Sequence, residues 1–501
     1  MLPSFAVCLV AATSLGANTP GEVGYDEIVN GVLAADAENE VRQTVLSRYA
    51  SVLDYKDFVR CVNGTNVWTA ALQKAIDENS IVVVPPSRQA YWLDGTVVVP
   101  SDRRIEAKGA TISLLPGTTT VMLRNEHVVD ETLSPAGGER RDANIAIVGG
   151  RWTDWVGHRA GYGKSGRYDS LCRATGKYYG VSSLFLFSGC NHLTLKDLTF
   201  EGASAFAVQI GCANSVTCKG IRFCACYADG LHVNGNVSLM HVQGVRGVVG
   251  DDLVALNAYD WLNSSINFGP QRDIICEDLV HEGGGYPAIR IQPGCFRFAD
   301  KSVVDCSVSR VIFRRVKGIT TFKMYLQTMP YPIGTEHEWG AVGSGGDIWF
   351  EDVDIDLSGP IDKIGQYAES EDVRGHFGAF EFGANLSRVV LRRVAINFHL
   401  DQWPLSHLAV VGPKSIVTFK DGKPEWETFD PWVDCRIGSL ILSDISLSGK
   451  TPSELVRITK FNNVNGDGCS SGRGVVDKLE IGAITTNQMR IVGGRHEVRP
   501  H

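Results

Sequence analysis

Three aspartates lie at matching positions in two neighbouring stretches of the sequence. Asp229 belongs to the stretch YADGLHVNG, and Asp251 and Asp252 belong to the stretch VVGDDLVALNA that follows. Each stretch ends in a short run of alternating apolar residues, as a half-buried β-strand does. Aspartate and glycine are common at bends, so either stretch alone would be read as a turn. Two such stretches in the same register instead predict three carboxyl groups that meet on neighbouring strands.

Carboxylates held this close repel one another, so we expect the pKa of at least one of them to rise. A carboxyl group that keeps its proton beside ionised carboxylates is suited to glycosidic bond cleavage. The protonated group gives its proton to the leaving oxygen, while an ionised one takes a proton from the attacking water. The chemistry predicted for the three aspartates is therefore glycan hydrolysis.

A second pattern indicates how these residues are positioned. The order apolar, any, apolar, two polar or small residues, apolar, any, apolar recurs along the chain, for example as LTLKDLTF at Leu193, VTCKGIRF at Val216 and VVLRRVAI at Val389. Alternating apolarity marks two short strands, and the polar or small pair marks a bend between them. One unit is too small to bury its apolar face, so successive units must stack into a solenoid. We therefore expect an all-β chain that forms a right-handed parallel β-helix.

A further series of strands places one outward-facing residue on each coil. The residue between two inward apolar neighbours points away from the core. Aligned in this way, the outward column reads Leu186, Gln209, His232, Ala255, Arg290, Tyr325 and Glu381. We expect it to form a polar stripe on the outside of the solenoid, with His232 and Arg290 beside the three aspartates.

The N-terminal segments differ from the repeats. Residues 1–17 resemble a secretory signal peptide that ends near Ala17, although no lysine or arginine precedes the apolar run; the alternative is a buried N-terminal segment. Residues 18–60 are expected to be an irregular lead-in, and residues 61–495 a single β-helix domain. Within that domain, VWTAALQKAIDEN from Val67 predicts an amphipathic helix that covers the open end of the solenoid, with Asn63 or Asn66 as its N-cap.

Composition narrows the choice of partners. The formal net charge is −8 and no basic run is present, which argues against a nucleic-acid partner. Beyond the N-terminal segment, no apolar run reaches the roughly 18 residues that a membrane span needs. The 13 cysteines show no paired CxxC spacing, so we expect no zinc site, while disulfides remain an open question. We expect no cofactor. The expected partner is a glycan substrate, and the oligomeric state is not readable from the sequence.

The order ADG, then GDD one coil later, resembles the polygalacturonase family of glycoside hydrolases (family 28), whose strands carry NTD and then GDD. The stretch VVVPPSRQAYWLDGTVVVPSDRRIEAKGATI, from Val82, is also similar to the first coils of pectin-lyase-like β-helix proteins. The resemblance implies a metal-free, inverting hydrolase of an α-linked glycan. It further implies that Asp251 is the general acid and that Asp229 and Asp252 activate water.

The chain departs from this family around the site. Tyr227 and Ala228 replace Asn and Thr, and Pro287 stands where the family has a histidine. The family holds a uronic acid with an Arg and a Lys; here Lys323 takes the arginine's place and Tyr325 the lysine's. Only one of these two cations is kept, so a neutral or amino sugar matches the site as well as galacturonate does. The α-1,3-galactosidase family of β-helix proteins has a similar arrangement of three aspartates.

The remaining candidates are expected to contact the sugar. They are His232, Arg290, Lys323, Tyr325, Gln209, Glu381, Tyr259 and Trp261. Tyr259 and Trp261 either stack their flat apolar faces on sugar rings or pack their loop onto the coil. Arg290 either binds sugar or pairs with Asp252. Glu381 lies far enough along the solenoid to serve a distal subsite only.

These observations predict a secreted glycoside hydrolase, and they leave two alternatives open. A polysaccharide lyase on the same fold would use Lys323 or Arg290 as its base and the aspartates to hold calcium. A non-catalytic, tailspike-like adhesive would bind a glycan without cleaving it, since a fold does not fix a function.

Overall fold

The computed structural model describes most of the chain, and every structural statement below concerns the described part. This part comprises residues 24–118, 120–128, 140–154, 156–158, 183–260, 266–284, 287–297, 303–324, 343–357, 378–398, 407–412, 418–420, 423–425, 435–450, 455–458, 460–461, 472–486, 490–492 and 495–496. The proposed signal peptide, Trp261 and Tyr325 lie outside it.

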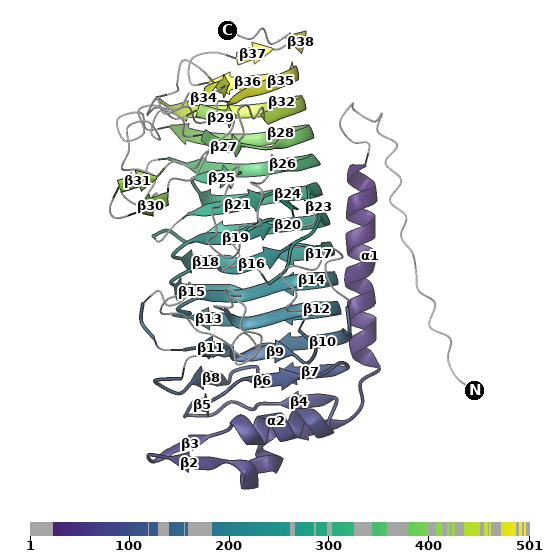
Figure 1. Cartoon of the computed structure of the whole chain (residues 1–501), viewed down its shortest axis with the longest axis vertical. Coiled ribbons are helices and arrows are strands. Elements are labelled where there is room, and N and C mark those ends of the chain that lie inside the picture. Colours follow the sequence, from purple (N-terminus) through teal and green to yellow (C-terminus); the bar gives the residue numbers. More distant parts are fainter. Residues whose placement is uncertain are drawn as a thin grey trace, which may run out of the picture.

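The chain forms a right-handed parallel β-helix, as the sequence predicts, with successive coils stacked along one axis (Figure 1). Its longest column of strands pairs in parallel without a break. In order, these strands are β1 (Tyr49–Ser51), β4 (Ile81–Val83), β7 (Arg103–Glu106), β10 (Asp142–Val148), β12 (Ser183–Lys196), β14 (Phe206–Lys219), β17 (Val237–Gln243), β20 (Gln271–His281), β24 (Val308–Ile319), β26 (Ser344–Asp356), β28 (Asn385–Phe398), β32 (Cys435–Gly449) and β35 (Gly472–Ile481).

Two further columns complete the coils. One contains β6 (Val97–Val99), β9 (Leu123–Asn125), the first halves of β12 and β14, β16 (Leu231–Asn234), β19 (Asp252–Asn257), β21 (Ala288–Gln292), β25 (Thr321–Lys323), β27 (Gly378–Phe382), β29 (His407–Val411) and β33 (Val456–Ile458). The other contains β3 (Thr65–Val67), β5 (Tyr91–Leu93), β8 (Thr111–Leu114), β11 (Arg151–Thr153), β13 (Thr199–Glu201), β15 (Arg222–Cys226) and β18 (Arg246–Val249), which joins β20. Short strands outside the columns are β2 (Arg60–Val62), β22 (Gly294–Arg297), β23 (Val303–Cys306), β30 (Thr418–Lys420), β31 (Lys423–Glu425), β34 (Lys460–Phe461), β36 (Ala483–Thr486), β37 (Arg490–Val492) and β38 (Arg495–His496).

The bend inside each repeat is a two-residue corner, as expected. Its second residue adopts a left-handed backbone conformation on one coil after another; these residues include Asp197, Gly220, Gly244, Asp278, Arg315, Asp352, Arg393 and Asp444. Asp and Gly tolerate this region well. The corners also carry charges of alternating sign from coil to coil, because Asp278, Arg315, Asp352 and Arg393 stand in one register. Arg315 pairs with Asp278 at 2.6 Å, and Arg393 pairs with Asp352 at 2.6 Å.

The interior is filled by columns of identical or similar apolar side chains. The rings of Phe313 and Phe350 stack at 5.5 Å, and those of Phe322 and Phe380 stack at 5.3 Å, on neighbouring strands of two columns. Each inward residue thus packs on its equivalent one coil away, which buries a continuous core. This packing fixes which residues along each strand face outward.

The helix expected at the end of the solenoid is α2 (Thr69–Glu78), which lies below the first coils (Figure 1). Its apolar face, which includes Leu72 and Ile76, is buried. The expected N-cap is wrong: Trp68 occupies that position, and no side chain caps the helix there. Asn66 instead belongs to β3, so its backbone is already committed to a strand. A short 3-10 helix, η1 (Val52–Phe58), packs beside α2.

The structure corrects the expected irregular lead-in, because part of it is a long helix. Helix α1 (Tyr25–Thr44) runs along the outside of the solenoid (Figure 1) and contacts strands from β10 to β24. Near its N-terminus, Ile28 and Val32 pack against Ile275, Ile312 and Trp349, whose side chains point outward from the coils.

The second half of α1 buries polar side chains against the solenoid. Asp36 accepts hydrogen bonds from Thr217 at 2.6 Å and from His241 at 3.1 Å, and it pairs with Lys219. The other ring nitrogen of His241 lies 3.0 Å from Glu277. Burial alone would raise the pKa of Asp36, but the hydrogen bonds, that from His241 foremost, outweigh it and lower the pKa to about 2. Charge and hydrogen bonding therefore hold this half of α1 in place.

None of the described helices is both long and apolar enough to cross a membrane. Nine cysteines in the described part are free of disulfides. Cys212, Cys218 and Cys226 are buried, and Cys224 is partly exposed.

Candidate active site

The three aspartates of the sequence motif meet at the start of two neighbouring strands. His232 in β16 pairs with Ala255 in β19, so Asp229 and Asp252 stand in the same register, and Asp251 precedes Asp252. One carboxylate oxygen of each aspartate lies within 4.8 Å of the other two. The predicted cluster is therefore present, and it lies on the outside of the core strands rather than among the apolar side chains.

Glycines beside the aspartates permit this close approach. A Cβ atom on Gly230 would lie 2.4 Å from the ring of Phe223 and 2.8 Å from the carbonyl oxygen of Leu253. A Cβ atom on Gly250 would lie 2.5 Å from the carbonyl oxygen of Tyr227. Any side chain at either position would push the two turns apart, so the glycines of ADG and GDD set the spacing of the carboxyl groups.

Asp252 is fully buried and faces two cations. Its carboxylate lies 2.7 Å from Nζ of Lys323 and 2.9 Å from Nε of Arg290. Burial raises the pKa of Asp252 to about 6, even though the two cations act in the opposite direction, and Asp251 and Asp229 add to the rise. The expectation that one pKa in the cluster rises is met, but its main cause is burial rather than repulsion.

Asp251 is the accessible member of the cluster. Its side chain is 20 % exposed, whereas that of Asp252 is 0 % exposed. Lys323 and Arg290 lie 3.7 Å and 3.8 Å from its carboxylate, farther than these two cations lie from Asp252.

Asp229 is held by a buried histidine that has a second carboxylate on its other side. Nδ1 of His232 lies 2.6 Å from Asp229, and Nε2 lies 3.0 Å from Asp260. Burial alone would lower the pKa of His232, but the hydrogen bonds and charges of the two aspartates outweigh it and raise the pKa to about 9. His232 is therefore a buried imidazolium and not a surface residue. Asp260 was not among the predicted site residues, because a single aspartate outside the repeats belongs to no recognisable pattern.

The outward column is confirmed up to Arg290 and then differs by two residues. Leu186, Gln209, His232, Ala255 and Arg290 pair in the expected succession. Arg290 then pairs with Lys323, so the assignment of Tyr325 to this position is wrong. Phe322 and Met324 are the inward neighbours, and the alternation of apolar residues continues past Met324, which makes both registers fit the sequence.

The column is also less exposed than a surface stripe. Gln209, His232, Lys323 and Glu381 are all between 0 % and 4 % exposed, and only Arg290 is partly accessible. Ile266 packs on Leu186, which shows that an inserted segment covers part of this face.

The other predicted binding residues lie in different settings. Gln209 donates to Asn234 at 2.7 Å, which itself lies next to His232. Tyr259 is buried with its ring 5.7 Å from that of Phe268, so it packs its loop onto the coil and does not offer a face to a sugar. Glu381 stands beside Lys323, since Phe322 pairs with Phe380.

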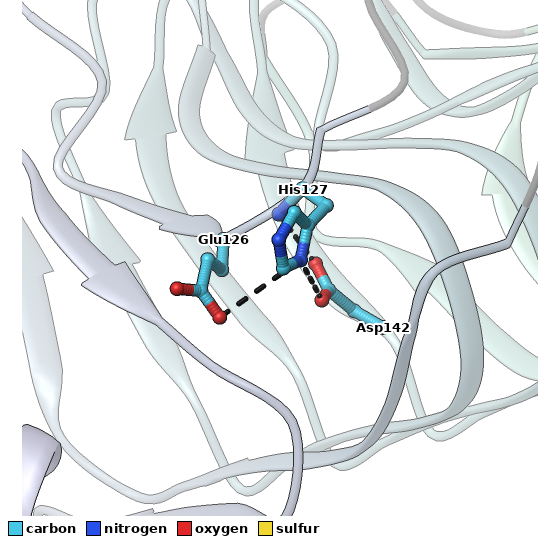
Figure 2. A group of neighbouring side chains, drawn as sticks. All are labelled: Glu126, His127 and Asp142. Atoms are coloured by element: carbon cyan, nitrogen blue, oxygen red, sulfur yellow. Dashed lines mark hydrogen bonds and ion pairs between the residues drawn. The ribbon is translucent and has the colours of Figure 1, made fainter.

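Two groups of described side chains have donor atoms close enough to bind one metal ion. In the aspartate cluster, Lys323 and Arg290 already face the oxygens of Asp252, which leaves little room for a further cation. The second group, Glu126, His127 and Asp142, is shown in Figure 2. There Nδ1 of His127 lies 2.8 Å from Asp142, and this bond raises the pKa of the imidazole, which disfavours metal binding by that nitrogen.

No protein-family model matches the chain, and no curated protein matches it in sequence. Among solved structures, it is similar to a hyperthermoactive exopolygalacturonase from Thermotoga maritima, at 12 % identity and a TM-score of 0.45 over 96 % of this chain and 100 % of the other. A family 28 exopolygalacturonase of Yersinia enterocolitica matches at 11 % identity and a TM-score of 0.40, over 87 % of this chain and 78 % of the other. The tailspike protein of the Escherichia coli bacteriophage HK620, solved in complex with a pentasaccharide, matches at 12 % identity and a TM-score of 0.44, over 81 % and 64 %.

Proposed function

We propose that the chain is a glycoside hydrolase that cleaves an α-linked glycan by acid and base catalysis. The observation that carries the proposal is the meeting of three carboxyl groups within 4.8 Å, of which Asp251 is partly exposed. With the pKa of Asp252 at about 6, this cluster retains a proton in mildly acidic solution. Asp251 is the member placed to hand a proton to a leaving oxygen, so we assign it as the general acid.

Asp229 is the better candidate for the base. Asp252 is engaged with Lys323 and Arg290, and because burial raises its pKa to about 6, it is protonated in acidic solution and cannot accept a proton there. Asp229 accepts a hydrogen bond from Nδ1 of His232, which holds its carboxylate in a fixed orientation. Asp252 then serves to hold the two cations and to share the proton of the cluster. Inversion of the anomeric centre is the stereochemistry that the family resemblance implies.

The charges favour a neutral substrate over a uronic acid. The two cations at the site already face Asp251 and Asp252, so a carboxylate on the sugar would have to compete with them. The same contacts disfavour the lyase alternative, because Lys323 is 1 % exposed and paired at 2.7 Å, and so it is not available to take a proton from a substrate.

The test is a panel of neutral and acidic α-linked oligosaccharides, with proton NMR of the first anomer released. Hydrolysis of a neutral member, lost in Asp251→Asn and unaffected by EDTA, is the expected result. An unsaturated product that needs calcium would show a lyase instead, and binding without cleavage by any member would show a glycan-binding protein. Export, which rests on residues 1–17, is tested by N-terminal sequencing of the mature protein.

A further inference from the structure

The imidazole of His232 is enclosed between two carboxylates. Asp229 lies 2.6 Å from Nδ1 and Asp260 lies 3.0 Å from Nε2, and none of the three side chains is more than 2 % exposed. The ring of Phe206 stacks on the imidazole at 3.8 Å and 10°, so the ring plane is fixed. Both nitrogens therefore point at an acid, and their partners cannot be exchanged by rotation of the ring.

Two further side chains fix the far side of this arrangement. Asn257 donates to Asp260 at 2.9 Å, which holds the carboxylate toward the ring. The amide nitrogen of Asn234 lies 3.2 Å from Nε2, and its amide is oriented by Gln209, which donates to the oxygen of Asn234. When the ring is charged, Nε2 carries a proton and donates a hydrogen bond to the carboxylate of Asp260. When the ring is neutral, Nε2 can accept a hydrogen bond from the amide N–H of Asn234. In both states Nδ1 keeps its hydrogen bond to Asp229.

We propose that Asp260 is a positioning residue that acts through His232 to hold the carboxylate of Asp229 in place as the base of the reaction. The inference rests on the proposed function for the role of Asp229, but the effect of Asp260 on His232 stands on the contacts alone. A carboxylate on Nε2 favours the charged imidazolium, and a hydrogen bond from a charged donor to a carboxylate is about twice as strong as one between neutral groups. Without Asp260, the ring loses one of its two carboxylate partners, and Nδ1 is held less firmly toward Asp229.

Other charged groups surround this triad and set the background for its titration. Asp251 and Asp252 stand at the start of β19, Arg290 comes from β21 and Lys323 from β25. Asp252 also donates its backbone N–H to Asp229 at 3.2 Å, so Asp229 has a second stabilising contact that does not depend on His232. The effect of Asp260 is therefore expected to be graded and not absolute.

The test compares Asp260→Asn with the wild type and with Asp352→Asn, a matched exchange at an exposed corner whose side chain is 43 % exposed. One readout needs no substrate, the titration of His232 by nitrogen-15 NMR. We expect Asp260→Asn to lower the pKa of His232 by about one unit, which is about tenfold in the protonation constant. The surface control should leave this pKa unchanged.

The kinetic readout is the pH profile of kcat/KM on the cleaved glycan. In Asp260→Asn kcat/KM should fall with KM little changed. Its decline on the alkaline side should begin about one pH unit lower, where His232 then loses its charge, and Asp260→Glu should restore both. If Asp260→Asn does not fold, Asp260→Ser, which is smaller, takes its place. An unchanged titration of His232, or a loss of kcat/KM that is equal at all pH values, would overturn the inference. If the wild type cleaves no glycan, the proposed function fails, while the NMR titration still decides whether Asp260 controls the charge on His232.

Discussion

Asparagine in place of Asp251 and asparagine in place of Asp252 are expected to have opposite consequences, although the residues are adjacent. Asp252 is fully buried between Lys323 at 2.7 Å and Arg290 at 2.9 Å. Its removal leaves two cations without their main partner, and breaking a buried pair in this way costs about 3–5 kcal/mol of stability. Asp251 is 20 % exposed and the same two cations lie 3.7 Å and 3.8 Å from it, so loss of these ion pairs should cost less than about 1 kcal/mol.

The loss of activity per folded molecule should follow the reverse order, with Asp251→Asn losing more than Asp252→Asn. Loss of a general acid lowers turnover by about 10²–10⁴-fold, which is a rise of about 3–5 kcal/mol in the activation barrier. Asp251→Asn should therefore be folded and inactive, whereas the activity of Asp252→Asn should be limited by how much of it is folded.

The two variants are compared by urea unfolding followed by circular dichroism, and by turnover of the glycan at a fixed concentration of folded enzyme. Asp352→Asn at an exposed corner serves as the control for a change from aspartate to asparagine. Equal destabilisation of the Asp251 and Asp252 variants would refute the difference in burial and pairing described above. An active Asp251→Asn would remove Asp251 from the chemistry.

Three further outcomes follow from other parts of the molecule. The pKa of Asp36 is lowered to about 2, so its ionised side chain stabilises the docking of α1 above the ordinary value of 3.8, and this stabilisation is lost as the pH falls toward 2. Hydrogen exchange of α1 amides, corrected for intrinsic rate, should therefore rise over that range in the wild type. Asp36→Asn should show faster exchange already at pH 7. Gly230→Ala places a Cβ 2.4 Å from the ring of Phe223 and should cost about 1–3 kcal/mol in urea unfolding and lower the activity, and an unaffected variant would show that the turn yields freely. Arg393→Gln, at a pair with Asp352 whose side chains are 45 % and 43 % exposed, should change the free energy of unfolding by less than about 1 kcal/mol, and a larger loss would show that the corner charges act as a network.

The β-helix was predictable because each repeat has the same order of apolar and polar residue types. Alternating apolar residues mark the strands, and the polar or small pair marks a corner that requires a left-handed backbone. Helix α1 has no comparable signal, since its buried face changes from Ile28 and Val32 to Asp36, Asn39 and Gln43. Half of that face is polar because it docks on the hydroxyl, amide and charged side chains of the outer coils. A pattern of apolar residues cannot reveal an interface that is made by hydrogen bonds.

The site was predictable only as far as register alone determines it. The meeting of Asp229, Asp251 and Asp252 needs nothing more than the correct alignment of two strands, and the structure brings them together. The sequence alignment put Tyr325 in the outward column where the structure has Lys323, two residues earlier, because the apolar alternation around Lys323 fits either register. The burial of the outward column and the contact of Asp260 with His232 depend on inserted segments, whose path over the coils has no periodicity to read.

The alternating charges at the corners restrict the number of coils that this part of the solenoid can gain or lose. Asp278, Arg315, Asp352 and Arg393 succeed one another in one register, and beside them Glu277, Arg314, Glu351 and Arg392 do the same. Excision of a single coil between them would bring either acid against acid or base against base, in both rows at once. Excision or duplication of two coils would restore every match, so this stretch of the protein can change its length at little electrostatic cost only in even steps.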